Sequence, residues 1–150
     1  MSVTTRARAP WPLLPSLLVV LAAPQCDERV VNGRPPREGV FTLHVGETIA
    51  YEPPGAEIGF QRVTGDSRCP TRVTCVWEGE ATARLWVLEP RKDSAFVELK
   101  LRGTSPSDPA PIGSAGHRIT ALRLDPYPAE PGPIPEADYM VTLRLDRVRR

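Results

Sequence analysis

The feature of this sequence that most restricts its fold is an alternation of apolar and polar residues with a period of two. It recurs between residues 40 and 148, and it is clearest in 80–88 (EATARLWVL), 95–101 (AFVELKL) and 138–146 (DYMVTLRLD). This period places alternate side chains on opposite faces of a β-strand, whereas a helix requires a period near 3.6. The pattern therefore predicts an all-β domain of about seven short antiparallel strands.

Loops rich in proline, glycine, serine and aspartate separate these segments. The stretches 104–116 (TSPSDPAPIGSAG) and 125–138 (DPYPAEPGPIPEAD) hold many of the 18 prolines, and proline cannot donate to a strand ladder. We expect both to be surface loops. Short strands between such loops favour a β-sandwich with an immunoglobulin-like topology, and a small β-barrel is the alternative. Gly59 and Ala121 mark expected bulges.

The first 25 residues are typical of an export signal. Arg6 and Arg8 precede a run, WPLLPSLLVVLAA, that is shorter than the roughly 20 apolar residues of a membrane-spanning helix. Residues 26–39 (CDERVVNGRPPREG) are polar and indicate a disordered tether, which leaves a single folded domain at 40–148. We expect an exported protein that is periplasmic or anchored at the outer membrane or cell surface.

Charge gives no reason to expect a nucleic-acid partner. Removing the first 25 residues takes away two of the 19 Lys and Arg residues and none of the 18 Asp and Glu residues, so the remainder is near −1. Proteins that hold nucleic acid neutralise its phosphates with a basic surplus, which is absent here. The basic end at 144–150 (RLDRVRR) is interpreted as a solvated strand end.

The three cysteines predict one disulfide and one leftover thiol. Cys69 and Cys75 lie six positions apart, and we expect them to pair in an oxidising compartment, which closes a loop worth roughly 2.4 kcal/mol by chain entropy. Cys26 is then left over. It follows LAAPQ, which is similar to a lipobox, so Cys26 is a candidate lipidation site and the only expected contact with a membrane. A free thiol in the tether is the alternative.

The metal-ligating residue types do not form a convincing site. His44 and His117 complete a nominal Cys₂His₂ set, but the Cys-x₅-Cys spacing is wide for zinc and no second histidine follows either one closely. A calcium site at Asp66 competes with a structural turn in which its carboxylate accepts backbone N–H bonds, and the turn is favoured. We predict no metal and no cofactor.

The cysteine segment also supplies candidate binding residues. Arg68 is expected to pair with Asp66 or Glu78, or to lie unpaired on the surface. Trp77 is expected to pack against the disulfide in the core. Trp86 lies on the strand face opposite Leu85 and Val87, either as an exposed anchor for a partner or beneath a proline-rich loop. The candidate binding residues are Asp66, Arg68, Arg72 and Trp86.

Residues 63–87 (VTGDSRCPTRVTCVWEGEATARLWV) resemble a segment of small uncharacterised bacterial secreted proteins and lipoproteins. The shared pattern is a Val-x-x-Asp-Ser-Arg-Cys-Pro turn followed by Cys-Val-Trp-Ala-Gly-x-Ala, with Glu78 here in place of the alanine. Further matches are Phe41, Leu43, Pro126-Tyr127-Pro128, Tyr139, Val141 and Leu143. The resemblance implies export and a β-rich domain, and it supplies no activity.

No residue pattern in the sequence predicts an enzyme. Its serines lie in no Gly-x-Ser-x-Gly setting, the histidines have no evident partners, and no glycine-rich phosphate loop is present. We expect a structural or accessory domain of the cell envelope. The alternative is a module that binds an envelope protein or glycan through the Cys69–Cys75 loop. A protease inhibitor that presents Arg72 is a less favoured version of that alternative.

Overall fold

The computed structural model of this protein describes residues 38–114 and 116–148. The expected export signal, Cys26 and almost all of the expected tether lie outside these residues. Eight β-strands and one short 3₁₀ turn form the described fold: β1 (Gly39–His44), β2 (Thr48–Tyr51), β3 (Ala56–Asp66), β4 (Glu80–Leu88), β5 (Ala95–Arg102), β6 (Ala110–Ile112), β7 (His117–Asp125), η1 (Glu136–Asp138) and β8 (Met140–Arg147).

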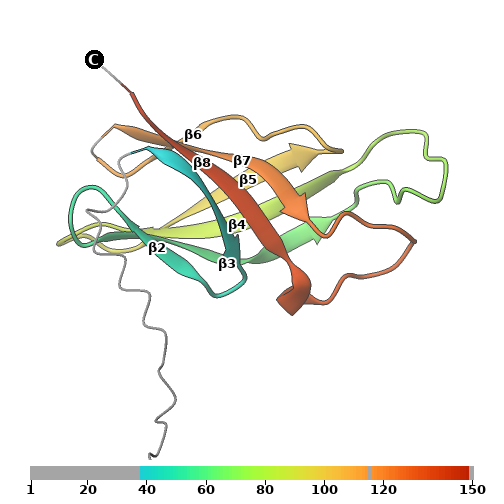
Figure 1. The fold of residues 1–150 in the computed structure, drawn as a ribbon, viewed down its shortest axis with the longest axis horizontal. Coiled ribbons are helices and arrows are strands. Elements are labelled where there is room, and N and C mark those ends of the chain that lie inside the picture. Colours follow the sequence, from blue (N-terminus) through green and yellow to red (C-terminus); the bar gives the residue numbers. More distant parts are fainter. Residues whose placement is uncertain (1–37, 115, 149–150) are drawn as a thin grey trace, which may run out of the picture. The chain divides into compact units, whose positions relative to one another are not determined.

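The strands form two four-stranded sheets, ordered β1-β8-β7-β6 and β2-β3-β4-β5. Every pairing within the sheets is antiparallel. Figure 1 shows the sheets stacked as two layers. The predicted all-β sandwich is therefore confirmed.

The immunoglobulin-like topology is wrong. In that topology, Greek-key connections distribute successive strands between the two sheets. Here β2 to β5 follow one another within one sheet, β6 to β8 do so within the other, and β1 pairs with β8. Most consecutive strands are therefore neighbours, as in an up-and-down barrel. The barrel is open at two places, because β1 does not pair with β2 and β5 does not pair with β6.

The predicted alternation fills the space between the sheets. Along β4 the burial alternates at every residue, with Ala81, Ala83, Leu85 and Val87 buried. β8 does the same from Val141 to Leu145. Large side chains from both sheets complete the core, among them Tyr51, Ile58, Phe60, Leu99, Ile119 and Leu124.

The expected bulge near Ala121 is confirmed. β7 pairs with β8 in continuous register up to Ala121, and the register shifts between Ala121 and Arg123. The inserted residue, Leu122, is half-buried and lines a cavity that is described below. The bulge therefore places the Leu122 side chain in the lining of that cavity.

The expected bulge at Gly59 is wrong. Gly59 stands in register opposite Trp86, and the register shifts of β3 come later, between Phe60 and Arg62 and between Val63 and Gly65. A Cβ atom at position 59 would lie 2.2 Å from the Trp86 indole. The glycine therefore makes room for the aromatic ring, which lies across it on the outer face of the sheet.

One of the two proline-rich loops contains a strand that was not expected. β6 lies within residues 104–116 and pairs with β7 at one end of its sheet. Pro111 is tolerated there because an edge strand needs donors on one side only. Residues 126–139 do form a loop, which lies at the same end of the sandwich as the loop between β3 and β4 (Figure 1).

Candidate functional site

Cys69 and Cys75 form a disulfide, as predicted, with an S–S distance of 2.06 Å and a Cα–Cα distance of 6.0 Å. They close the disulfide loop, residues 69–75, between β3 and β4. A structural disulfide indicates an oxidising compartment outside the cytoplasm. The sulfur atoms of the nominal zinc set are thereby bonded to each other.

Backbone hydrogen bonds continue the β3–β4 ladder up to the disulfide. The Ser67 N–H donates to Glu80 O at 2.8 Å, and the Cys69 N–H donates to Glu78 O at 2.9 Å. Gly79 permits this approach, because it has a φ of 68° and a Cβ there would lie 1.9 Å from Ser67 O. The glycine of the Cys-Val-Trp-Glu-Gly run is thus required by the backbone geometry.

The disulfide loop is also docked on the segment that follows β7. The N–H groups of Thr71 and Arg72 donate to Pro128 O and Ala129 O at 3.0 and 3.2 Å. The Arg72 side chain, which is 71% exposed, reaches Glu130 at 2.5 Å. The two loops at this end therefore support each other.

Asp66 and Arg68 form a buried ion pair beneath the disulfide loop. The Arg68 Nε and Nη2 atoms donate to the two carboxylate oxygens of Asp66 at 2.9 and 2.6 Å. The backbone N–H of Arg68 also donates to Asp66 Oδ1 at 3.1 Å. The predicted backbone N–H bond to the Asp66 carboxylate and its pairing with Arg68 are both observed. The chain does not turn here, however, because Asp66 is the last residue of β3 and the ladder with β4 continues past it.

Arg68 extends this pair across to the other sheet. Its Nη1 atom donates to Leu124 O at 2.6 Å, and Nη2 donates to Pro126 O at 3.0 Å. The guanidinium lies 4.9 Å from the centre of the Tyr127 ring, within cation–π range. Tyr139 Oη donates to Asp66 Oδ2 at 3.0 Å. These contacts join the end of β3 to the end of β7 and the start of β8.

The surroundings of the pair shift the pKa values of Asp66 and Tyr139 in opposite directions. Burial by itself would raise the pKa of Asp66, but hydrogen bonds from the Arg68 side chain and backbone outweigh it and lower that pKa. The pKa of Tyr139 is raised to about 12, first by burial and then by its bond to the carboxylate. Asp66 therefore stays ionised and Tyr139 stays protonated at neutral pH.

Two of the four candidate binding residues are thus structural in this geometry. The Arg68 side chain is 2% exposed and the Asp66 side chain 9%. Both oxygens of Asp66 already accept hydrogen bonds, so a calcium ion at this position would have to displace Arg68. In the part of the chain that the structure describes, no group of three or more His, Cys, Asp and Glu side chains is placed to hold a metal ion.

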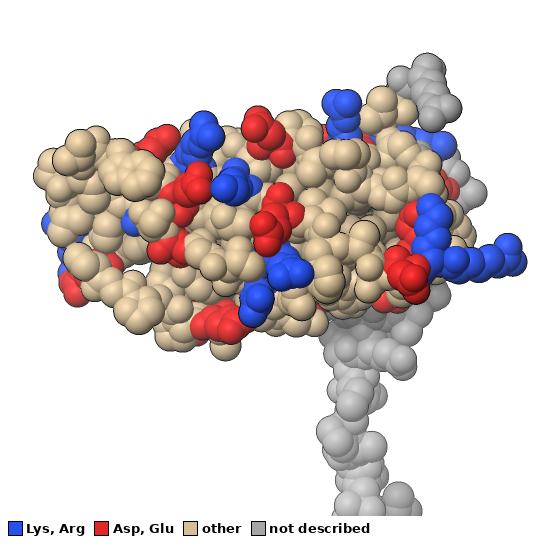
Figure 2. All heavy atoms as spheres, turned by 180° about the vertical axis from the view of Figure 1, so that it is seen from behind, with Lys and Arg blue, Asp and Glu red and all other residues tan. Residues whose placement is uncertain are grey.

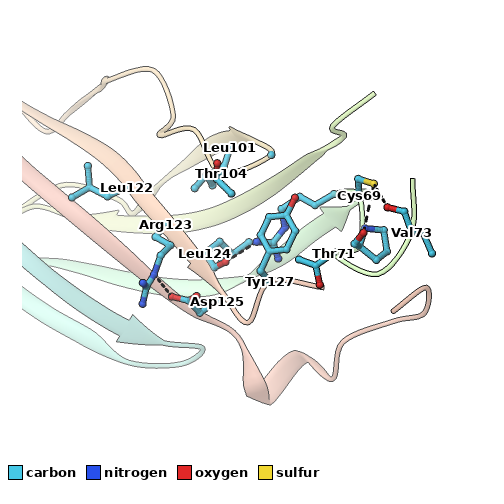
Figure 3. Close-up of a pocket in the computed structure, with 13 residues that line it drawn as sticks. Cys69, Thr71, Val73, Leu101, Thr104, Leu122, Arg123, Leu124, Asp125 and Tyr127 are labelled. Carbon is cyan, nitrogen blue, oxygen red and sulfur yellow. Dashed lines mark hydrogen bonds and ion pairs between the residues drawn. The ribbon is translucent and has the colours of Figure 1, made fainter. Parts of the chain in front are cut away.

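A cavity of about 460 Å³ opens beside this ion pair, between β5, β7 and the disulfide loop (Figure 3). We call it the edge cavity. Figure 3 shows the Tyr127 ring between Leu124 and the disulfide loop, with Leu101 and Thr104 coming from the β5 side. Its apolar lining consists of Pro70, Val73, Leu101, Leu122, Leu124 and Tyr127.

Three apolar side chains stand exposed on and beside the disulfide loop. Val73 is 42% exposed, Trp77 is 72% exposed and Val76 is fully exposed. We call them the apolar tip. The prediction that Trp77 packs against the disulfide in the core is wrong, because β4 begins only at Glu80 and no sheet pairing turns Trp77 inward.

Trp86 lies apart from this end of the molecule. It is half-buried near the far end of β4, against Gly59 and opposite Phe96. His44 is exposed on β1, as expected, whereas His117 starts β7 and is buried. The structure therefore brings together Asp66, Arg68 and Arg72 but does not bring Trp86 to them.

Most of the residues that line the edge cavity are not marked by any local sequence pattern. Tyr127 appeared only as part of the family resemblance, and Leu122 and Thr104 carried no signal of their own. The one local signal for the cavity was Tyr127 between Pro126 and Pro128, because the two prolines restrict the backbone and so limit where the ring can lie.

Comparison of the chain with protein-family models, with curated proteins and with solved structures found no match. Among residues 38–114 and 116–148, no helix is long and apolar enough to cross a membrane. The interpretation of this end of the sandwich therefore depends on its geometry.

Proposed function

We propose that this protein is an exported, non-enzymatic binding domain that recognises a partner protein of the cell envelope through the apolar tip and the neighbouring edge cavity. The observation that carries the proposal is the exposure of Val73, Val76 and Trp77 on a braced loop. Isolated exposed apolar residues are ordinary, but a group containing a tryptophan beside an apolar cavity is typical of an interaction site.

The construction of the loop favours recognition, because the loop needs little ordering on binding. The disulfide closes it, the Thr71 and Arg72 backbone bonds fix it to the neighbouring loop, and the ion pair of Asp66 and Arg68 supports it from below. A surface that is already ordered loses less conformational entropy when it binds. Rigid sandwiches commonly carry recognition on such end loops.

A protein fits this surface better than a glycan does. Sugar hydroxyl groups need hydrogen-bonding partners when they are buried, whereas the apolar tip offers two valines and an indole. Charges of both signs are interspersed over the face shown in Figure 2, so that face has no patch of a single sign to attract a polyanion.

A protease inhibitor fits less well. An inhibitory loop must offer its backbone to the protease, but the Thr71 and Arg72 N–H groups are bonded to Pro128 and Ala129. The Arg72 side chain is paired with Glu130. Failure of the purified protein to slow trypsin at micromolar concentration is the expected result.

Affinity purification with exposed-residue variants tests the proposal. Wild type, Trp77→Ala and Val76→Ser are used as baits in envelope extracts, and Phe96→Ala, which alters an exposed aromatic residue on another face, is the control. We expect one or more proteins to be retained by wild type and Phe96→Ala and lost from both tip variants. Equal retention by all four baits would favour a structural or accessory role instead.

Anchoring through Cys26 is a separate part of the proposal. It is tested by metabolic labelling of wild type and Cys26→Ala with a palmitate analogue. Label on the wild type alone is the expected outcome, and equal label on both chains would exclude a lipid at this residue.

A further inference from the structure

We propose that the edge cavity receives one uncharged apolar side chain from an extended segment of the partner protein, and that this segment pairs with the open edge of β7. The inference rests on the proposed binding function and specifies the form of the ligand. It follows from the strand pairing, from the apolar lining of the edge cavity and from the ion pairs that the charged side chains around the cavity already form.

The strand pairing leaves part of β7 open on one side. β8 pairs with β7 along its whole length, but β6 pairs with β7 only at His117, Arg118 and Ile119. Ser107 then exchanges hydrogen bonds with Ala121, its N–H donating to Ala121 O at 2.8 Å and its Oγ accepting from Ala121 N at 2.9 Å. Along residues 122–125, no described strand lies beside β7 opposite β8.

The strand across the opening is an edge strand as well. β5 is the last strand of its sheet, and its end at Leu101 lines the edge cavity together with Leu122 and Leu124 of β7. Exposed strand edges present backbone groups that pair readily with another extended chain. A helical ligand has already bonded its own backbone groups and cannot add to a strand edge in this way.

The size of the opening limits the contact to a few residues. The opening is bounded along β7 by Ser107 at one end and by the Arg68 guanidinium, bonded to Leu124 O, at the other. Its volume of about 460 Å³ lies within the range of roughly 300–1,000 Å³ that ligand pockets occupy. The edge cavity is therefore large enough for one large apolar side chain together with the backbone beside it.

The charges around the edge cavity are already matched within the protein. Asp66 neutralises Arg68, and four of the five guanidinium N–H groups are bonded. On the rim, Arg123 pairs with Asp125 at 2.5 Å. An anionic ligand, such as a phosphate or a fatty-acid carboxylate, would find no unpaired cation, so an uncharged side chain is favoured.

Peptide selection tests the inference. A phage-displayed library of random nonapeptides is selected on the full exported chain, and the Kd of each enriched peptide is measured by fluorescence anisotropy. Thr71→Trp and Thr104→Trp narrow the edge cavity from its exposed rim, and Thr48→Trp changes another exposed threonine, on β2. We expect enriched peptides to share an aliphatic or aromatic residue, to bind both rim variants at least tenfold more weakly, and to bind Thr48→Trp within twofold of wild type.

Backbone methylation of the best peptide tests strand pairing without altering the protein. An added antiparallel strand bonds through every second residue, so N-methylation is expected to weaken binding at alternate positions only. Uniform sensitivity, or none, would overturn strand pairing. Equal binding to wild type and both rim variants would overturn the cavity as the site.

The inference and the proposed function fail in different ways. If Trp77→Ala loses its envelope partner while Thr104→Trp keeps it, the binding function stands and the inference is wrong. If no peptide is enriched but the neutral dye N-phenyl-1-naphthylamine binds wild type and not Thr104→Trp, the edge cavity holds a small apolar ligand and the inference is likewise wrong.

Discussion

The two ends of the sandwich bury polar side chains in opposite ways. At the end that carries the disulfide loop, Asp66, Arg68 and Tyr139 satisfy one another and bind the carbonyls of Leu124 and Pro126. These bonds connect the two sheets and support the loops above them. The buried polar side chains at this end therefore stabilise the fold through hydrogen bonds between the two sheets.

The other end buries polar atoms without partners. Tyr51 Oη and both ring nitrogens of His117 are buried and have no hydrogen bond among the described residues. The two rings meet edge to face, with their centres 5.5 Å apart. Nearby, Glu89 is bonded to Lys92 and Ser114.

The contrast teaches that burial alone does not show what a polar residue contributes. Removing a partner from a satisfied network leaves other groups unpaired, whereas removing an unpartnered atom can relieve a desolvation cost. The same type of substitution is therefore expected to have different effects at the two ends, and the following predictions are ordered by the size of the expected effect.

Replacement of Arg68 is expected to be the most damaging change. Arg68→Met leaves the Asp66 carboxylate buried without its cation and should lower the free energy of unfolding by about 3–5 kcal/mol. Urea denaturation measures this loss. Arg123→Met, which removes an ion-paired arginine that is 71% exposed, should cost no more than about 1 kcal/mol. Equal losses in the two variants would refute the structural role of the buried pair.

Loss of the disulfide is expected to come next. The variant with both Cys69→Ser and Cys75→Ser should lose about 2.4 kcal/mol, because the unfolded chain gains the freedom that the closed loop removes. Thermal and urea unfolding under non-reducing conditions give the comparison with wild type. A variant as stable as wild type would mean that the backbone bonds of the loop suffice.

The two buried tyrosines offer the closest matched test. Tyr139→Phe removes a hydrogen bond to a charged group and should cost about 2 kcal/mol, whereas Tyr51→Phe removes a hydroxyl that has no partner and should change stability by less than about 0.5 kcal/mol. Both measurements use the free energy of unfolding in urea. A larger loss for Tyr51→Phe than for Tyr139→Phe would reverse the comparison of the two ends.

The smallest effects are expected in the pH dependence of stability. Burial and then the charge of Arg147 lower the pKa of His117 from 6.5, against opposing effects of Glu52, Glu38 and Glu89. The unfolded chain therefore takes up a proton first as the pH falls, and stability should decline below about pH 6.5. Urea denaturation between pH 7.5 and 5 should show a shallower decline for His117→Phe than for wild type.

The stability contributed by the end that carries the disulfide loop should depend on pH in a more acidic range. The pKa of Asp66 is lowered from 3.8, so its contribution to stability is complete above that value and is lost as the pH falls further. Asp66→Asn should be less stable at neutral pH and should show a shallower acidic decline, part of which remains because the pKa of Glu89 is lowered as well, by its hydrogen bonds with Lys92 and Ser114. If His117→Phe reduced the acidic decline and Asp66→Asn did not, the assignment of part of that decline to Asp66 would be wrong.

Local pattern predicted the parts of the structure that depend on near neighbours. The alternation in residues 80–88 specified which side chains of β4 face the core, and the spacing of Cys69 and Cys75 specified their disulfide. Each of these depends on contacts within a few residues or on one face of one strand, which a sequence displays directly.

Errors arose where a residue's environment comes from distant segments. Trp77 was expected inside, but the place where β4 begins leaves it outside the sheet. Gly59 was interpreted as a bulge because the sequence does not show that Trp86 lies across it. The immunoglobulin-like topology was wrong because a period of two specifies strands and their faces but does not specify which strands pair.

By itself, therefore, the sequence determined an all-β sandwich with one disulfide, since alternation and cysteine spacing are local properties of the chain. Tertiary structure decided that Arg68 is a buried link between the two sheets and that β7 has an open edge beside a leucine-lined cavity. Both depend on where β5, β7 and the loop after β7 meet, and residues so far apart in the chain reveal their proximity only once the sheets have packed.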